Sequence, residues 1–310
     1  MAGVKIIEGT FQVGGANLFT KSWLPEGPTK AKLIMIHGFS DHVDRYYDLF
    51  PSLARRGVAV YGFDQRGWGR SVRAPSERGR SGPTATVLAD IAAFARTKVL
   101  PAEPTGAPVF IYGHSMGGGE VLTLASSPEY ADLTSKIRGW ILEAPFLGFA
   151  PSVRPYWLTV VTGRLAARVV PNFHLVKPVP PEHLSRDVAV QKSIAADALM
   201  HNTGTLEGLA AMIDRAEFLA SGKLTLNPGV KSMFLAHGTA DMVTSFDSVK
   251  GWWERQKVED GKFKAYEGFY HQLHAEPGKE KFYRDVSDWI LERCGDVDVK
   301  GSAPPPEPKL

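Results

Sequence analysis

The stretch VFIYGHSMGGG, residues 109–119, decides the class of fold. Its first four residues are β-branched or aromatic, which is typical of a buried strand, and residues 116–124 open a helix. The Gly-x-Ser-x-Gly sequence between them predicts a nucleophile elbow, a strained turn that lifts the hydroxyl of Ser115 into a pocket. We expect Gly113 and Gly117 beside the serine because a Cβ there would collide with the neighbouring strand or helix. The simpler alternative is a glycine-rich turn capped by a serine.

A nucleophilic serine needs a general base, and in elbow folds the order along the chain is serine, acid, histidine. Six histidines follow the elbow: His174, His183, His201, His237, His271 and His274. The first three fall in a stretch without a parallel-strand pattern, and His237 lies within an apolar run as a packed strand-end residue. His271 comes first in the loop after the last predicted strand, residues 263–266, so we predict it as the base. His274 is the alternative.

The acid is expected after the preceding strand, residues 233–236. Asp241 lies in the polar turn that follows, where a carboxylate could orient the imidazole and stabilise the imidazolium. The alternative is that Asp241 caps a helix starting near Ser245. Asp247 lies too far inside that helix to be the better acid.

An oxyanion hole would complete the site. One donor is expected to be the backbone N–H of Met116, directly after the nucleophile. The other is expected after the early strand 33–36, where Gly38 lets the chain bend so that the Phe39 N–H points at the developing charge. Four parts in the expected order are far more specific than any one of them.

These motifs resemble one family. Residues 37–46 resemble the H-G-x-x-[ED]-H-x-x-R-Y stretch of monoacylglycerol lipases, and residues 113–118, 238–241 and 270–274 resemble the elbow, acid turn and histidine loop of that family. In that family the first histidine of H-x-x-L-H is the base, which supports His271.

The resemblance extends from about Phe11 to Cys294, nearly the whole chain. It implies an α/β-hydrolase fold with a mostly parallel central sheet, and hydrolysis of a monoacylglycerol to glycerol and a fatty acid. Related bacterial and plant lysophospholipases share much of the pattern, and general carboxylesterases of short or medium chain length are a further alternative. A catalytically idle lipid-binding scaffold, or an aminopeptidase of the same fold, would also fit the fold.

Composition agrees with a single globular enzyme. The chain has 310 residues, 44% of them hydrophobic, a formal net charge of +3 and one cysteine, Cys294. The small, scattered charge does not indicate nucleic acid as a partner. One cysteine excludes an internal disulfide and fits a reducing, cytoplasmic compartment. We expect no secretory signal, no spanning helix, no metal and no organic cofactor.

Strands alternate with helices along the chain, which predicts a parallel sheet with a hairpin, 10–13 and 16–23, at its edge. Almost ninety residues separate the strands ending at Glu143 and starting near Lys231, too many for one crossover. We therefore predict four segments, whose bounds are 1–147 for the first part of the core, 148–222 for a helical cap, 223–297 for the second part of the core and 298–310 for a disordered tail. The tail ends in Pro-Lys-Leu (308–310), which faintly resembles the peroxisomal S-K-L address.

The cap begins with a helix, residues 155–170, that is apolar almost all round. Such helices are usually buried, but this one could instead line an acyl tunnel. It could also enter a membrane or lipid-droplet interface with Arg164 and Arg168 at the headgroups, which would make the protein peripherally membrane-associated.

The polar end of an acyl pocket is expected near Arg45, Asp41 and His114, of which we predict Arg45 and His114 as substrate-binding. The alternative for Arg45 is a structural ion pair with Asp41 or Asp44. Family members often carry a cap tyrosine that reaches glycerol, whereas here that place holds Ile194 or a neighbour. Glycerol selectivity is therefore open from sequence.

Overall fold

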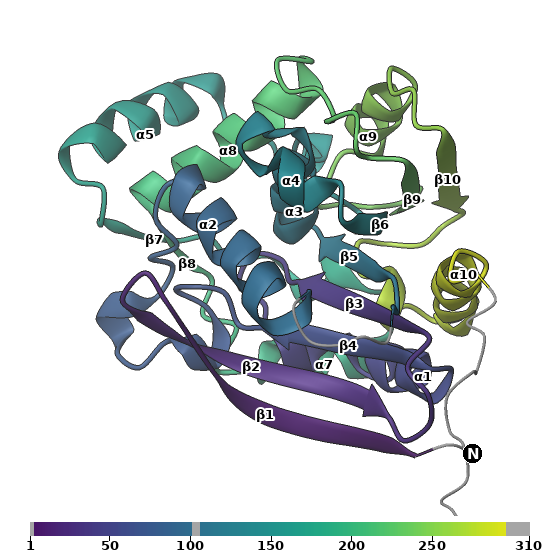
Figure 1. Cartoon of the computed structure of the whole chain (residues 1–310). Helices are drawn as coiled ribbons and strands as arrows, with labels where there is room; N and C mark the ends of the chain where they lie inside the picture. Colours follow the sequence, from purple (N-terminus) through teal and green to yellow (C-terminus); the bar gives the residue numbers. More distant parts are fainter. Residues whose placement is uncertain (1–2, 101–105, 296–310) are drawn as a thin grey trace, which may run out of the picture.

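An eight-stranded sheet forms the centre of the computed structural model, which describes residues 3–100 and 106–295 (Figure 1). The strand order is β1-β2-β4-β3-β5-β6-β9-β10, antiparallel at β1, β2 and β4 and parallel from β4 onward. The strands are β1 (Val4–Val13), β2 (Ala16–Pro25), β3 (Ala31–Ile36), β4 (Val58–Phe63), β5 (Val109–His114), β6 (Ile137–Glu143), β9 (Ser232–Gly238) and β10 (Asp260–Tyr266). The predicted parallel sheet with an edge hairpin is confirmed.

Helices cover both faces of this sheet. They are α1 (Leu49–Arg55), α2 (Thr84–Phe94), α3 (Met116–Ser126), α4 (Ala131–Thr134), α9 (Phe246–Trp253) and α10 (Glu280–Leu291). Short 3-10 turns occur at Val43–Tyr46, Gly69–Ser71, Pro75–Glu77, Pro128–Tyr130, Pro151–Val153 and Leu273–Ala275. A π-helical turn, Ala95–Val99, follows α2 directly.

The core lies in two layers, one on each side of the sheet. Along β3, Leu33 and Met35 face the layer formed with α1 and α10, while Ile34 and Ile36 face the layer formed with α2 and α3. Burial on both faces explains why the central strands read as continuous apolar runs. β1 begins six residues earlier than expected because its first half is an exposed edge without a clear apolar period.

The residues between β6 and β9 include the stretch predicted as a cap, which we call the inserted segment (residues 148–222). It contains α5 (Trp157–Val169), β7 (His174–Val176), α6 (Pro181–Leu184), α7 (Val188–Ala195), β8 (Thr203–Thr205) and α8 (Leu206–Ala220). α8 contacts α5 on one side and α3 on the other, with Leu219 in the core layer (Figure 1). One helix thus joins the inserted segment to the helix that follows the nucleophile elbow.

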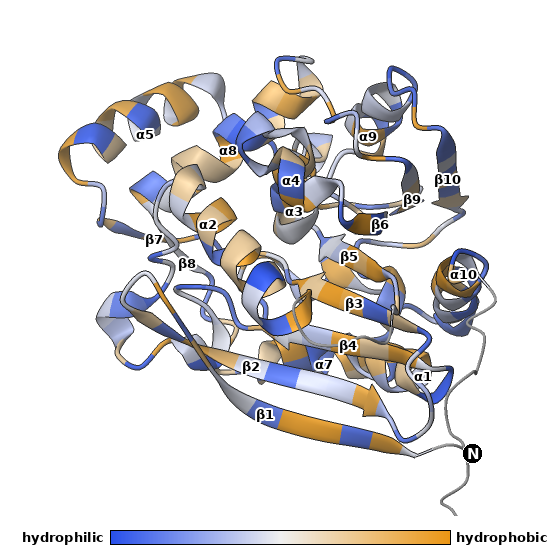
Figure 2. Cartoon of the chain, viewed as in Figure 1, coloured by the Kyte–Doolittle hydropathy of each residue, from blue (hydrophilic) through white to orange (hydrophobic). Residues whose placement is uncertain are grey.

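α5 lies at the periphery of the molecule, and none of its residues is buried (Figures 1 and 2). The alternative that this apolar helix is buried in the core is therefore wrong. Its Arg164 forms ion pairs with Asp214 and Glu217 of α8, both at 2.6 Å. Of the two arginines predicted to reach headgroups, only Arg168 is exposed.

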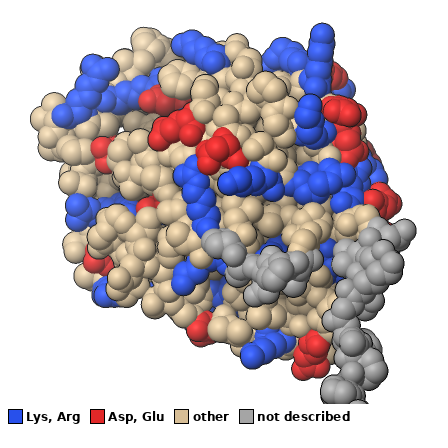
Figure 3. Space-filling model, in the orientation of Figure 1, with Lys and Arg blue, Asp and Glu red and all other residues tan. Residues whose placement is uncertain are grey.

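In the described part of the chain, no helix is both long enough and apolar enough to cross a membrane. On the face shown in Figure 3, Lys and Arg are interspersed with Asp and Glu over most of the surface. The predicted tail and its Pro-Lys-Leu end lie outside the described residues.

Candidate active site

The elbow has the predicted geometry. Ser115 lies between β5 and α3 with φ 53° and ψ −119°, a strained conformation for a residue with a side chain. An ideal Cβ on Gly113 would lie 2.6 Å from the Gly117 carbonyl oxygen, and one on Gly117 would lie 2.4 Å from the Ile36 oxygen. The glycines are therefore needed for close approach, while the unusual dihedral angles fall on the serine itself.

The structure brings the three predicted triad residues together. The Oγ of Ser115 lies 2.9 Å from Nε2 of His271, and Nδ1 of His271 lies 2.8 Å from Oδ2 of Asp241. With the proton on Nδ1 donated to the carboxylate, Nε2 is free to accept the serine proton. The ring of His274 bonds Glu143, whereas that of His271 bonds Ser115, so the geometry favours His271 over the alternative.

Asp241 is held by several donors at once. Its Oδ1 accepts the backbone N–H groups of Val243 (2.7 Å) and Thr244 (2.9 Å). Its Oδ2 accepts the Thr244 hydroxyl at 2.7 Å and lies 3.1 Å from Nε2 of His237. Burial would raise the pKa of Asp241, but the charge of His271 and the hydrogen bonds from His237 and His271 outweigh it and hold the pKa well below the ordinary value.

The helix-cap alternative for Asp241 is wrong. The helix after this turn is α9, and its N-cap is Ser245, whose hydroxyl accepts the N–H of Ser248 at 3.1 Å. Asp247 lies within the first turn of α9, as expected. The carboxylate of Asp241 therefore does not cap α9, and its Oδ2 contacts the ring of His271.

The two predicted oxyanion donors border the nucleophile. Phe39 follows β3, Met116 begins α3, and both line a cavity together with Ser115. Met116 is the first helical residue, so its N–H has no acceptor within the helix. A Cβ on Gly38 would lie 3.2 Å from the Cβ of Ser115, which shows how closely the loop after β3 approaches the elbow.

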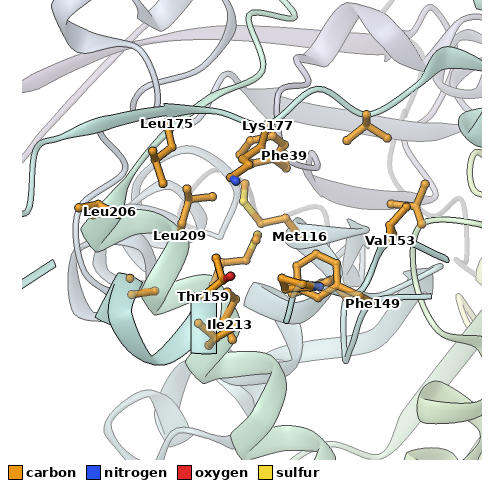
Figure 4. Close-up of a pocket in the computed structure, with 18 of the residues that line it drawn as sticks. Phe39, Met116, Phe149, Val153, Thr159, Leu175, Lys177, Leu206, Leu209 and Ile213 are labelled. Atoms are coloured by element: carbon orange, nitrogen blue, oxygen red, sulfur yellow. The ribbon is translucent and has the colours of Figure 1, made fainter. Parts of the chain in front are cut away.

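Two cavities meet at Ser115. The first, which we call the apolar cavity, has a volume of about 460 Å³ and is walled by α5 and α8 of the inserted segment together with Phe39, Met116 and Phe149 (Figure 4). The second, which we call the polar cavity, has a volume of about 350 Å³ and also contains His271. The serine hydroxyl therefore lies where an apolar cavity meets one whose lining also includes charged and polar side chains.

Two carboxylates and an imidazole line the polar cavity: the buried Asp41 and His114, and the partly exposed Asp197. Burial would raise the pKa of Asp41, but hydrogen bonding and charge interactions with nearby histidines lower it. Burial lowers the pKa of His114 to about 3, with Asp41 opposing the shift, so its imidazole is neutral at ordinary pH. Ile194 lines the same cavity.

Arg45 lies behind this cavity. It is 5% exposed, is not among the described residues that line either cavity, and its guanidinium contacts Oδ2 of Asp197 at 3.4 Å and Oγ of Ser193 at 2.9 Å. The alternative of a structural ion pair named the wrong partner, because Arg45 pairs with Asp197 of the inserted segment and not with Asp41 or Asp44. The geometry places Arg45 as a support for Asp197, and its predicted contact with substrate stays a prediction.

A buried group behind the triad was missed from sequence. Glu143 at the end of β6 accepts hydrogen bonds from the His274 ring at 2.9 Å and from the Tyr112 hydroxyl. Burial raises the pKa of Glu143 well above its ordinary value and lowers that of His274 to about 3. The polar residue ending an apolar strand at Glu143, and the second histidine of the histidine loop, are the signals that could have revealed this pair.

One group among the described residues has the residue types of a metal site. Ligand atoms of His114, Glu143 and His274 lie within 4.8 Å of one another, and all three residues are buried. Both oxygens of Glu143 already accept hydrogen bonds from His274 or Tyr112, so they are occupied by partners within the protein. The arrangement fits a buried hydrogen-bond network better than a cation site.

These features define an α/β-hydrolase with a serine nucleophile placed beyond the carboxyl ends of its parallel strands. A family model described as serine aminopeptidase, S33 (Hydrolase_4) matches residues 27–278, and the chain belongs to this family of serine hydrolases.

Relatives of known sequence or structure agree with this membership. The putative monoglyceride lipase of Schizosaccharomyces pombe is 35% identical over 283 residues, which cover 89% of this chain and 72% of that protein. Human monoglyceride lipase is 28% identical over 304 residues, covering 94% and 91% of the two chains. A soluble variant of monoglyceride lipase from Saccharomyces cerevisiae, solved in complex with a substrate analog, superposes with a TM-score of 0.83 at 21% identity and covers 92% of this chain and 94% of that one, which shows a shared fold.

Proposed function

We propose that this protein hydrolyses monoacylglycerols to glycerol and a free fatty acid through an acyl-enzyme intermediate. The observation that carries the proposal is the position of Ser115, where an apolar cavity of about 460 Å³ meets a polar cavity of about 350 Å³. An ester bound across this junction would place its acyl chain against α5 and α8 and its glycerol beside His114. The names of the relatives described above support the same substrate.

In the proposed reaction, Oγ of Ser115 attacks the ester carbonyl as its proton passes to Nε2 of His271. Asp241 holds the imidazole and stabilises its positive charge. The N–H groups of Phe39 and Met116 stabilise the oxyanion. The imidazolium then gives its proton to the departing glycerol oxygen, and water hydrolyses the acyl-serine by the same route.

In this proposal residues 148–222 act as a cap, because α5 and α8 form the wall of the acyl site opposite the elbow. The charges of the polar cavity also bear on substrate choice. Asp41 would repel a phosphate headgroup, which favours a neutral polyol over an anionic lysophospholipid. Ile194 offers glycerol no hydroxyl, which favours a second candidate function on other small neutral esters.

The test is fatty acid release from equal concentrations of monooleoylglycerol, dioleoylglycerol, trioleoylglycerol, lysophosphatidylcholine and a short p-nitrophenyl ester. We expect the highest rate on monooleoylglycerol, and Ser115→Ala to abolish it while circular dichroism stays unchanged. Preference for the short ester or for lysophosphatidylcholine would keep the triad and overturn the substrate. A wild type that neither turns over any ester nor reacts with a fluorophosphonate probe would favour the lipid-binding scaffold.

We further propose that α5 docks the protein on a lipid surface. Its outer face carries large exposed apolar side chains four residues apart: Trp157 is 74% exposed, Val161 41%, Leu165 56% and Val169 79%. The opposite face of the same helix, with Thr159, lines the apolar cavity (Figure 4). An interfacial helix would therefore lie between the lipid surface and the acyl site.

Co-sedimentation with phosphatidylcholine vesicles tests the docking. We expect Trp157→Ala with Leu158→Ala to lower the vesicle partition coefficient more than tenfold, because the two lost side chains together remove roughly 2 to 6 kcal/mol of apolar burial. Unchanged sedimentation of this double variant would contradict the docking role of α5.

A further inference from the structure

The residue after Phe39 has an unusual backbone conformation. Ser40 has φ 51° and is only 1% exposed. Residues with a Cβ seldom occupy this left-handed region, and where they do the surrounding structure imposes it. A glycine would adopt the same conformation without strain. An interaction of the Ser40 side chain must therefore compensate for the unfavourable backbone conformation.

The serine side chain has one close partner in the inserted segment. The backbone N–H of Asn202 donates to Oγ of Ser40 at 2.7 Å. Asn202 also has a positive φ, 54°, and its carbonyl accepts the N–H of Lys177 at 2.6 Å. The bond thus joins the loop after β3 to a backbone that is itself fixed within the inserted segment.

A second contact links the same two parts of the chain. The indole of Trp68 lies edge-on to the ring of Phe39, with centroids 4.9 Å apart, and stacks on the imidazole of His201, with centroids 5.2 Å apart and planes 7° apart. His201 directly precedes Asn202, and its Nε2 lies 3.1 Å from the Gly67 carbonyl oxygen. Ser40 is consequently held directly by Asn202, and Phe39 packs against Trp68, on which the adjacent His201 stacks.

We propose that Ser40 is a positioning residue, whose hydrogen bond from Asn202 holds the Phe39 N–H at the distance and angle needed to bind the oxyanion. This inference rests on the proposed function, in which Phe39 supplies one donor. Oxyanion donors act through fixed geometry, and the loss of one costs about a hundred- to a thousandfold in rate. If the loop is no longer held at Ser40, the Phe39 N–H should lose part of this stabilisation of the oxyanion.

The opposing explanation is that the Ser40 hydroxyl only anchors the inserted segment and contributes to stability. Two substitutions separate these explanations. Ser40→Ala removes the acceptor and keeps the strain of a side chain at positive φ, whereas Ser40→Gly removes the acceptor and relieves the strain. Stability should therefore differ between the two variants, while the missing hydrogen bond is common to both.

The experiment measures kcat and KM on a short p-nitrophenyl ester, the rate of fluorophosphonate labelling of Ser115, and Tm for the full-length chain. We expect both variants to lose roughly tenfold in kcat and in labelling rate, with KM nearly unchanged, since the hydrogen bond serves the transition state. We expect the Tm of Ser40→Gly to exceed that of Ser40→Ala. Equal losses of rate at unequal Tm would separate positioning from stability.

The matched control is Thr205→Ala. Thr205 lies three residues after Asn202, is 1% exposed, and its hydroxyl also bonds the core, donating to the Gly79 carbonyl at 3.2 Å, but it does not contact the oxyanion loop. We expect a lower Tm and a wild-type kcat for this variant.

Three results would overturn the inference: wild-type rates in both Ser40 variants, rates that follow Tm across all variants, or an equal loss in Thr205→Ala. A wild type that is labelled by the fluorophosphonate but releases nothing from monooleoylglycerol would overturn only the proposed substrate. A wild type that is not labelled at all would overturn both proposals.

Discussion

At the scale of single residues, the site depends on how firmly hydrogen bonds hold the carboxylate of Asp241. Its Oδ2 lies within hydrogen-bond distance of the His271 ring, the Thr244 hydroxyl and the His237 ring. A carboxylate with so many donors keeps its charge and its direction in a buried site. The imidazole of His271 is therefore held in one tautomer and one orientation before substrate arrives.

Asp241→Asn tests the role of this charged carboxylate. An amide cannot stabilise the imidazolium and favours the wrong tautomer, so we expect kcat to fall by about 10⁴-fold with little change in KM. Thr244→Val is the graded comparison, because it removes one hydrogen bond to Oδ2 and leaves the carboxylate, and should cost only a few-fold. Stopped assays on the short ester measure both. An Asp241→Asn variant with more than a tenth of wild-type kcat would contradict the role of the acid.

The residues of the triad could be predicted from sequence because each follows a recognisable strand in a fixed order. His237 and Thr244 could not, because a histidine inside an apolar run and a threonine in a turn carry no signal of their contact with Asp241. Arg45 was predictable as a polar residue near the site, but its partner Asp197 comes from the turn after α7, 152 positions away. Contacts made across the inserted segment need the fold before they can be assigned.

At the scale of helices and strands, a buried ion pair joins the helix after the elbow to the inserted segment. Nη2 of Arg215 on α8 lies 3.2 Å from Oε1 of Glu120 on α3, and the two side chains are 5% and 1% exposed. Burial raises the pKa of Glu120 to about 7 and lowers that of Arg215, with the mutual attraction opposing both shifts. Both groups move toward their neutral forms, so burial outweighs the attraction between them.

This pair predicts a pH dependence of stability. The pKa of Glu120 in the folded chain, about 7, exceeds its ordinary value of 4.5, so between these values the folded state keeps a proton that the unfolded state has released. The contribution of Glu120 to the free energy of unfolding must then decline, by at most about 3 kcal/mol, as pH rises from about 4.5 to 7. Above pH 7 this contribution stays constant. Glu120→Gln carries no such proton.

Thermal unfolding of wild type and Glu120→Gln between pH 5 and 8 measures the effect. We expect the Tm of wild type minus that of the variant to decrease by several degrees across this range, whatever its starting sign. Parallel Tm curves would show that Glu120 is ionised throughout and that the pair is favourable.

α5 offers a test of the acyl site at a position without clashes. Gly163 lines the apolar cavity, and an added Cβ would meet no atom within 4 Å. Gly163→Leu should fill part of the cavity and gain about 0.8 kcal/mol of helix propensity. We expect kcat/KM for monooleoylglycerol to fall roughly tenfold while the short ester is unaffected.

Gly251→Leu is the matched control, because Gly251 lies within α9, lines no described cavity and has similar space around it. Equal kinetics of the two variants on monooleoylglycerol would contradict the acyl role of the cavity.

The sequence predicted α5 as an apolar helix that could lie in the core, line an acyl tunnel or enter a lipid surface. Only the three-dimensional arrangement separates the face that lines the cavity from the face that is exposed, because apolar residues occur on both faces of the helix.

At the scale of the whole molecule, the fold was predictable from sequence because the buried parallel strands are apolar runs that each end in a motif. The layout of the inserted segment was not, since its short elements lack a strong period and its contacts with the core are formed by isolated residues such as Asn202 and Arg215. The result is a division of labour. The sheet fixes the reacting groups, and the inserted segment supplies the walls of both cavities and an exposed apolar surface.

This division predicts that lipid docking and chemistry can be separated. Trp157→Ser combined with Leu165→Ser removes two exposed apolar side chains from the outer face of α5, and neither residue lines a described cavity. We expect hydrolysis of monooleoylglycerol presented in phosphatidylcholine vesicles to fall on the order of tenfold, because docking would lose apolar burial of a few kcal/mol. Turnover of the dissolved short ester should match wild type, since no group at Ser115 changes.

Ile6→Ser with Ile7→Ser, on the exposed edge strand β1, removes comparable apolar surface and should leave both rates unchanged. If this β1 variant slowed vesicle hydrolysis as much as the α5 variant, the docking surface would not be confined to α5, and if both α5 rates fell together, the helix would serve the chemistry and not the interface.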